Sequence, residues 1–132
     1  MTIMNKLSRP LAILLVEDDV LNQRLTYLLL EKRGYTVDAV NNGEKALELL
    51  LEKNYDSVLL DLYMDGMDGF EVAKRIRQFE DQNKANIPII AITAFSEAEV
   101  KSKLKDLKVE TILTKPFQIE EVEKTLQAIF ID

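Results

Sequence analysis

The sequence predicts an α/β fold in which helices cover a parallel sheet. Five short apolar segments alternate with segments whose apolar residues recur every three or four positions, the pattern of amphipathic helices. Most of the apolar segments are continuous, which is typical of strands that are buried on both faces. Because strand–helix–strand connections are right-handed, the helices would pack over the sheet.

The first half of the chain supplies three strands and two helices. Strands are expected at residues 11–16, 35–40 and 57–60. The first helix is expected to bury one stripe, consisting of Leu21, Leu25, Leu28 and Leu29. Gly34 would end it in a left-handed conformation, and residues 41–43 (Asn-Asn-Gly) form a turn. The second helix is expected to bury Ala46, Leu47, Leu50 and Leu51.

The second half supplies two more strands, at residues 87–92 and 111–113. Asp68 is expected to cap the third helix, residues 81–86 to form a flexible connection, and residues 96–99 (Ser-Glu-Ala-Glu) to be a capping box for the fourth helix. The inward residues of the last three helices are Val72, Ile76 and Phe79, then Val100, Leu104 and Leu107, then Ile119, Val122, Leu126 and Ile129.

Composition limits the possible functions. With 132 residues, 47% of them hydrophobic, we expect a flexible segment over residues 1–10 and a single domain over residues 11–132. The net charge of −6 argues against nucleic-acid or anionic-membrane binding. The absence of cysteine and histidine excludes thiol chemistry and most zinc sites. No apolar run approaches the roughly 20 residues that span a bilayer, so we expect a cytoplasmic protein without membrane insertion, as a monomer or weak dimer.

Polar residues follow four of the predicted strands. Glu17 and Asp18 follow the first strand, Asp61 the third and Thr93 the fourth, while Lys115 lies just beyond the fifth. The carboxyl ends of parallel strands meet at one edge of a sheet, where ligands bind near the point at which strand order reverses. We therefore expect these side chains to converge.

Three converging carboxylates repel one another unless a cation compensates them. Mg²⁺ suits such oxygen ligands, with Mn²⁺ as an alternative ion. Asp61 can also act as a nucleophile that accepts a phosphoryl group, whose oxygens Lys115 and Thr93 would then bind. Taken singly, Thr93 could instead cap a loop, Lys115 could be a surface lysine, and Asp19 fits a helix start.

Four motifs together resemble response-regulator receiver domains, the phosphoacceptor modules of two-component signalling. They are residues 15–18 (Leu-Val-Glu-Asp), residues 60–61 (Leu-Asp) with Met64 and residues 67–69 (Met-Asp-Gly), residues 92–94 (Ile-Thr-Ala), and residues 115–117 (Lys-Pro-Phe). The resemblance covers residues 11 to about 130. It implies a flavodoxin-like (βα)5 doubly wound fold, with a five-stranded parallel sheet of order 2-1-3-4-5.

The resemblance also implies the roles of the site residues. Asp61 would take phosphate from a histidine kinase, a histidine phosphotransfer protein or a small donor such as acetyl phosphate. Mg²⁺ would be bound by Asp18, Asp61 and the backbone carbonyl of Tyr63, and through water by Glu17. Thr93, Ala94 and Lys115 would bind the phosphoryl group, and the bond before Pro116 would be cis. Such a domain is no enzyme beyond its own phosphotransfer and slow autodephosphorylation, and an unknown downstream protein would read its state.

Five positions set this chain apart within the receiver pattern. Ile112 stands where an aromatic residue usually moves with the switch threonine, which puts that switch in doubt. Lys108 replaces a common glycine, so its loop is expected to follow another route, and Asp65 replaces a proline, which predicts a more flexible loop. Tyr63 and Phe95 occupy positions that tune access of water to the phosphoryl group. Because both are bulky, we expect slow autodephosphorylation.

Three other functions compete with this assignment. A haloacid-dehalogenase-type phosphatase needs an acid two residues after its nucleophile, where this chain has Tyr63. A flavodoxin-like binder of flavin mononucleotide needs a phosphate loop rich in hydroxyls and glycine, whereas residues 17–19 are acidic. A receiver-like interaction module, with weak or no switching on phosphorylation, remains the main alternative because of Ile112.

Overall fold

The structure is a computed structural model, and it describes residues 9–130. Most of the predicted flexible segment, up to residue 8, lies outside the described residues. The strands are β1 (Ala12–Val16), β2 (Thr36–Val40), β3 (Ser57–Asp61), β4 (Ile89–Thr93) and β5 (Thr111–Thr114). The helices are α1 (Val20–Lys32), α2 (Gly43–Glu52), α3 (Gly69–Arg77), α4 (Gln82–Ala85), α5 (Glu97–Lys101) and α6 (Ile119–Phe130).

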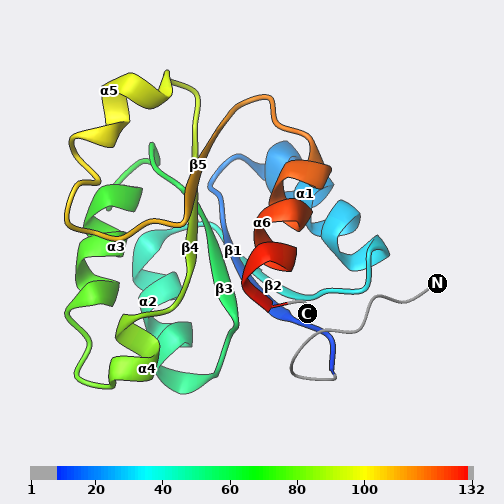
Figure 1. Ribbon diagram of the computed structural model, residues 1–132, viewed down its shortest axis with the longest axis horizontal. Helices are drawn as coiled ribbons and strands as arrows, with labels where there is room; N and C mark the ends of the chain where they lie inside the picture. The colour runs from blue at the N-terminus through cyan, green and yellow to red at the C-terminus, as the bar shows by residue number, and fades with distance from the viewer. Residues whose placement is uncertain (1–8, 131–132) are drawn as a thin grey trace.

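All strand pairs are parallel, and the order across the sheet is β2-β1-β3-β4-β5. This confirms the predicted fold class and strand order. Helices α1 and α6 cover one face of the sheet, and α2, α3, α4 and α5 cover the other (Figure 1). The order reverses beside β1, where the chain goes first outward to β2 and then across to β3. The carboxyl ends of β1 and β3 therefore flank the switch point of the sheet.

Alternate residues of the central strands fill two separate cores. Leu14, Val16 and Leu60 pack with α2 and α3 residues on one face, whereas Leu15 and Leu59 pack with α1 and α6 residues on the other. Every residue of β3 and β4 is buried. Both side-chain directions must then be apolar, which explains why these strands appear in the sequence as continuous apolar runs.

Helix α1 corrects one prediction. Three leucines of the expected inward stripe face solvent, with Leu21 81%, Leu25 58% and Leu28 48% exposed. Leu29 packs partly buried against the core, and Thr26 and Leu30 are the buried residues. The helix carries apolar residues on more than one face, so spacing alone could not select the buried one. Leu51 of α2, also expected inside, is likewise exposed.

The segment between α3 and β4 was predicted as a flexible connection, but it contains the short helix α4. Asp81 caps this helix, because its Oδ1 accepts hydrogen bonds from the backbone N–H groups of Asn83 and Lys84. Lys84 in turn donates to the carbonyls of Leu50 and Lys53 at the end of α2. The polar residues of this segment thus serve capping and bridging.

The segment around α5 differs from expectation in two ways. Ser96 is the N-cap residue of α5, but its side chain makes no capping hydrogen bond, and the helix ends at Lys101. Val100 and Leu104 are buried as predicted. Lys108 adopts the left-handed conformation with φ 54°, so the loop keeps the backbone route for which glycine is usual rather than taking another.

Candidate functional site

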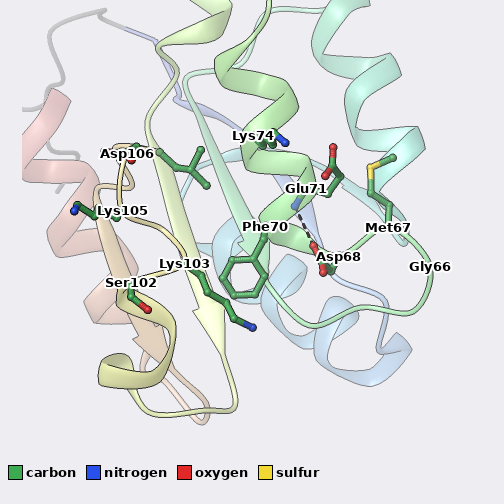
Figure 2. Close-up of a pocket in the computed structure, with 11 residues that line it drawn as sticks. Gly66, Met67, Asp68, Phe70, Glu71, Lys74, Ser102, Lys103, Lys105 and Asp106 are labelled. Atoms are coloured by element: carbon green, nitrogen blue, oxygen red, sulfur yellow. Dashed lines mark hydrogen bonds between the residues drawn. The ribbon is translucent and has the colours of Figure 1, made fainter.

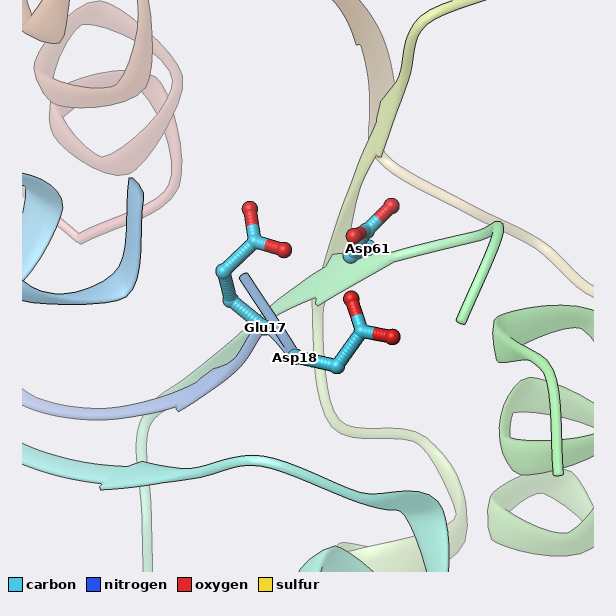
Figure 3. A group of neighbouring side chains, drawn as sticks. All are labelled: Glu17, Asp18 and Asp61. Atoms are coloured by element: carbon cyan, nitrogen blue, oxygen red, sulfur yellow. The ribbon is translucent and has the colours of Figure 1, made fainter. Parts of the chain in front are cut away.

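Side chains from four strand ends meet in one crevice at the switch point. Glu17 and Asp18 follow β1, Asp61 ends β3, Thr93 ends β4, and Lys115 follows β5. Carboxylate oxygens of the three acids lie within 4.8 Å of one another (Figure 3). Glu17 and Asp61 are each only 3% exposed, and Thr93 is fully buried. The structure thus brings together the residues that sequence reasoning placed at one edge.

The loop between β1 and α1 holds two of the acids in place. Asp19 caps α1, since its Oδ1 accepts from the backbone N–H of Asn22 at 2.9 Å, and its own N–H donates to Oε2 of Glu17 at 3.3 Å. This bears out the helix-start explanation of Asp19. Across the crevice, Oδ2 of Asp18 accepts from the backbone N–H of Asp65 at 3.1 Å. Glu17 is therefore linked to the start of α1, and Asp18 to the loop that follows β3.

Lys115 contacts both of the buried acids. Its Nζ lies 2.9 Å from Oε1 of Glu17 and 3.3 Å from Oδ2 of Asp61. Burial raises the pKa of Glu17 to about 7, with a further contribution from Asp61, while Lys115 acts in the opposite direction. Burial by itself would lower the pKa of Lys115, but its contacts with Glu17 and Asp61 prevail and raise it. The lysine stays charged, and Glu17 is easily protonated.

The donor set fits a hard divalent cation. Three carboxylates share one lysine, which contacts two of them. Mg²⁺ prefers oxygen ligands and typically uses one or two carboxylates, completed by water and phosphate oxygens. One ammonium group faces three carboxylates, which leaves an excess of negative charge at the site. A bound cation would offset this excess.

Thr93 and its neighbours form the other wall. The Oγ1 atom of Thr93 accepts from the backbone N–H of Phe95 at 2.9 Å, which matches the loop-cap explanation and leaves the hydroxyl hydrogen able to donate. Ala94 is exposed at the rim. The Lys115–Pro116 bond is cis. Ile112 packs beneath α5 against a small cluster that includes Leu62, Ala91, Val100 and Leu104.

An aromatic cluster lies at the rim. Tyr63 contacts Phe95 with ring centroids 4.5 Å apart, and it meets the edge of Phe70 at 5.4 Å. The ammonium of Lys103 lies 5.2 Å from the Phe70 ring centroid. Sequence reasoning singled out Tyr63 and Phe95, but it missed Phe70, because the contact depends on how α3 begins.

Two further residues support the site through the backbone. The side-chain amide of Gln23 donates to the backbone carbonyls of Glu17 and Val40. Gly69 begins α3 directly against the end of β3, where an added Cβ would lie 2.6 Å from the Cα of Leu62. Gly69 belongs to the motif at residues 67–69, but its close approach to β3 and the two hydrogen bonds of Gln23 depend on contacts that no local pattern indicates.

A groove lies beside this crevice rather than in it. It has a volume of about 600 Å³ and runs between α3 and the segment after α5, with Phe70 and Lys103 on its walls (Figure 2). None of the three acids lines it. The groove and the carboxylate crevice are therefore separate features of the surface.

Fold and site together define a doubly wound α/β domain with an acidic, lysine-paired crevice at its switch point. The family model of the response regulator receiver domain matches residues 13–127, so the chain belongs to this family. This confirms the family that the sequence motifs indicated. Receiver domains are signalling modules of two-component systems, they bind Mg²⁺ at an acidic site, and they interact with histidine kinases or phosphotransfer proteins.

Curated relatives are longer than this chain. The transcriptional regulatory protein ResD of Bacillus subtilis is 37% identical over 117 residues, which are 89% of this chain and 47% of that protein. Hybrid signal transduction histidine kinase K of Dictyostelium discoideum is 32% identical over 120 residues, which are 87% of this chain and 10% of that protein. The chain therefore spans half or less of the length of either relative.

Solved structures show the same fold. The receiver domain of the sensor histidine kinase PA1611 of Pseudomonas aeruginosa, with a magnesium ion in its active site cleft, is 32% identical, with a TM-score of 0.81 and coverage of 90% of this chain and 96% of that chain. TrrA of Thermotoga maritima, in complex with Mg²⁺ and BeF, is 33% identical, with a TM-score of 0.77 and coverage of 89% and 97%. Within residues 9–130, no helix is long and apolar enough to cross a bilayer.

Proposed function

We propose that residues 11–132 act as a phosphoacceptor domain in which Asp61 is phosphorylated in the presence of Mg²⁺. The observation that carries this proposal is the geometry around Asp61. A nearly buried carboxylate at a strand end lies against a lysine and within reach of two further acids, in a chain that belongs to the receiver family. Mg²⁺ would be held by Asp18, Asp61 and the backbone carbonyl of Tyr63, and by Glu17 through water.

In the proposed reaction an Asp61 oxygen attacks the phosphorus of a phosphohistidine or of acetyl phosphate. A new O–P bond forms as the bond to imidazole nitrogen or acetate oxygen breaks, and the electron pair leaves with that group. Bound Mg²⁺ supplies positive charge to the phosphoryl oxygens. Lys115 already contacts Asp61 and would follow the added charge, and the Thr93 hydroxyl, whose oxygen accepts from Phe95, would donate to a phosphoryl oxygen.

Phosphorylation would act by population shift. The added charge would draw Lys115 away from Glu17, and it would draw Thr93 toward the phosphate. A cytoplasmic partner protein would read the surface built by residues 96–108, 111–113 and 118–129. Inverting a 1:99 equilibrium to 99:1 needs roughly 5.5 kcal/mol of differential stabilisation. The packing of Ile112 beneath α5 favours the alternative of weak switching, because an aliphatic side chain held in a cluster offers no polar partner for Thr93.

Intact-mass analysis after incubation with acetyl phosphate and Mg²⁺ tests the proposal. The wild-type protein is expected to gain one phosphoryl group, and omission of Mg²⁺ or the substitution Asp61→Asn is expected to abolish the gain. Asp65→Asn, which removes an exposed acid of the neighbouring loop, serves as the matched control and is expected to leave the gain intact. Equal addition to the wild type and to Asp61→Asn would refute the assignment.

The rim aromatics predict a long-lived phosphorylated state. Tyr63 and Phe95 contact each other at the mouth of the crevice and would hinder the in-line approach of water to the phosphorus. Phe95→Ala is expected to speed dephosphorylation about tenfold, which corresponds to about 1.4 kcal/mol of barrier. A radiolabel chase measures the rate, with exposed Leu51→Ala at a distance as the control. Loss of wild-type label within seconds would contradict the prediction.

A further inference from the structure

We propose that Gln23 is a positioning residue that sets the geometry of the cation site, an inference that rests on the proposed binding of Mg²⁺ by the acids after β1. Gln23 lies one turn into α1, on the side of the helix that faces the sheet rather than among the exposed leucines. Its Nε2 donates to the carbonyl of Glu17 and to the carbonyl of Val40, each at 3.0 Å. The two hydrogens of one amide thus bind two carbonyls, one just after β1 and one at the end of β2.

These bonds tie three elements together at one point. Val40 is the last residue of β2, and its carbonyl also accepts a hydrogen bond from the backbone N–H of Glu17 at 3.1 Å. The Gln23 amide therefore links the end of β1, the end of β2 and helix α1. Only residues 17–19 separate β1 from α1, so a fixed carbonyl at Glu17 restricts the backbone that carries both acids.

The chemistry of an amide suits this position. Glu17, Asp18 and Asp61 repel one another, and Lys115 contacts only Glu17 and Asp61, so the backbone after β1 needs a further restraint. A lysine or arginine at position 23 could also donate to the carbonyls, but its charge would pair with the acids and oppose a bound cation. Glutamine restrains the backbone through neutral hydrogen bonds. It does not pair with the carboxylates, so they stay available to bind the cation. Groups that orient metal ligands in this way commonly affect metal affinity strongly when they are removed.

Calorimetric titration of the full chain with MgCl₂ tests the inference, using Gln23→Met, which keeps the length of the side chain but removes both donors. The dissociation constant for Mg²⁺ is expected to rise about tenfold. Gln78→Met, the same chemical change at the exposed end of α3, is expected to leave it unchanged. Phosphorylation by acetyl phosphate at saturating Mg²⁺ is expected to return to near the wild-type rate, because the loss acts through metal affinity.

A second measurement needs no metal. Amide hydrogen exchange in Mg²⁺-free protein is expected to become faster at Glu17 and Asp19 in Gln23→Met, whereas the Leu62 amide, which donates to Ile92, is expected to stay protected. If Gln23→Met fails to fold, Gln23→Asn takes its place, because its shorter amide cannot reach both carbonyls.

The outcomes separate the two proposals. A folded Gln23 variant with unchanged Mg²⁺ affinity and unchanged exchange would overturn the positioning role alone. Uniformly faster exchange at all amides, with unchanged affinity, would also overturn it, because the role would then be only structural. A wild-type protein that binds no Mg²⁺ would overturn this inference together with the proposed function.

Discussion

Gly69→Ala is expected to destabilise the protein by about 3 kcal/mol and to slow phosphorylation of Asp61 by about tenfold or more. Gly69 is the first residue of α3, and its N–H donates to the carbonyl of Leu62 at 2.9 Å. An added Cβ would meet the carbonyl oxygen of Asp61 and lie 2.6 Å from the Cα of Leu62. Because these neighbours are backbone atoms, either α3 or the end of β3 must move. Urea unfolding followed by circular dichroism measures the stability.

Gly34→Ala is the matched control for this substitution. Gly34 has φ 93° and no atom within 4 Å of an added Cβ, so the change adds backbone strain without a clash. It is expected to cost about 1 kcal/mol and to leave the phosphorylation rate unchanged. Equal losses of stability and of phosphorylation rate in the two variants would contradict this prediction. The need for glycine at position 69 would then come from its backbone conformation, not from the close approach to Asp61.

Arg77→Met is expected to destabilise the protein by about 3 kcal/mol. The half-buried guanidinium of Arg77 donates to four backbone carbonyls at 2.7 to 3.0 Å, those of Ala85, Ile87, Leu107 and Lys108. They belong to the entry to β4 and to the loop before β5. Methionine fills similar space but leaves these acceptors without the guanidinium. Urea unfolding measures the change.

The neighbouring arginine provides the control. Arg75 forms an exposed ion pair with Glu71 one turn away, so Arg75→Met is expected to cost about 0.5 kcal/mol or less. Arg77→Lys keeps the charge but not the planar set of donors, and it is expected to fall between the two methionine variants. A loss for Arg77→Met no larger than that for Arg75→Met would show that the four carbonyls are equally well satisfied by water.

Most of the fold could be predicted from the sequence, because burial on both faces forces continuous apolar strands and a parallel sheet brings its strand ends to one edge. The same reasoning located Glu17, Asp61 and Lys115 in one crevice. It did not fix the rotation of α1, since leucines occur on more than one side of that helix. The inner face is the one that carries Gln23, Thr26 and Leu30.

Other features depend on contacts between residues distant in sequence. The left-handed conformation of Lys108 is unfavourable for lysine by about 1 kcal/mol, yet its carbonyl accepts a hydrogen bond from Arg77, 31 residues earlier. Residues 81–86 looked like a flexible connection because they are polar, but Asp81 and Lys84 use that polarity within the structure. Local patterns carry no information on such partners.

The double contact of Lys115 has a consequence for the protein between signals. One ammonium group serves as an internal counter-ion for both Glu17 and Asp61. A cation that bound here would meet carboxylates already gathered around a positive charge, not a disordered pocket. Binding would consequently need little reorganisation of the backbone, and the resting and loaded forms would differ chiefly in which group faces each carboxylate.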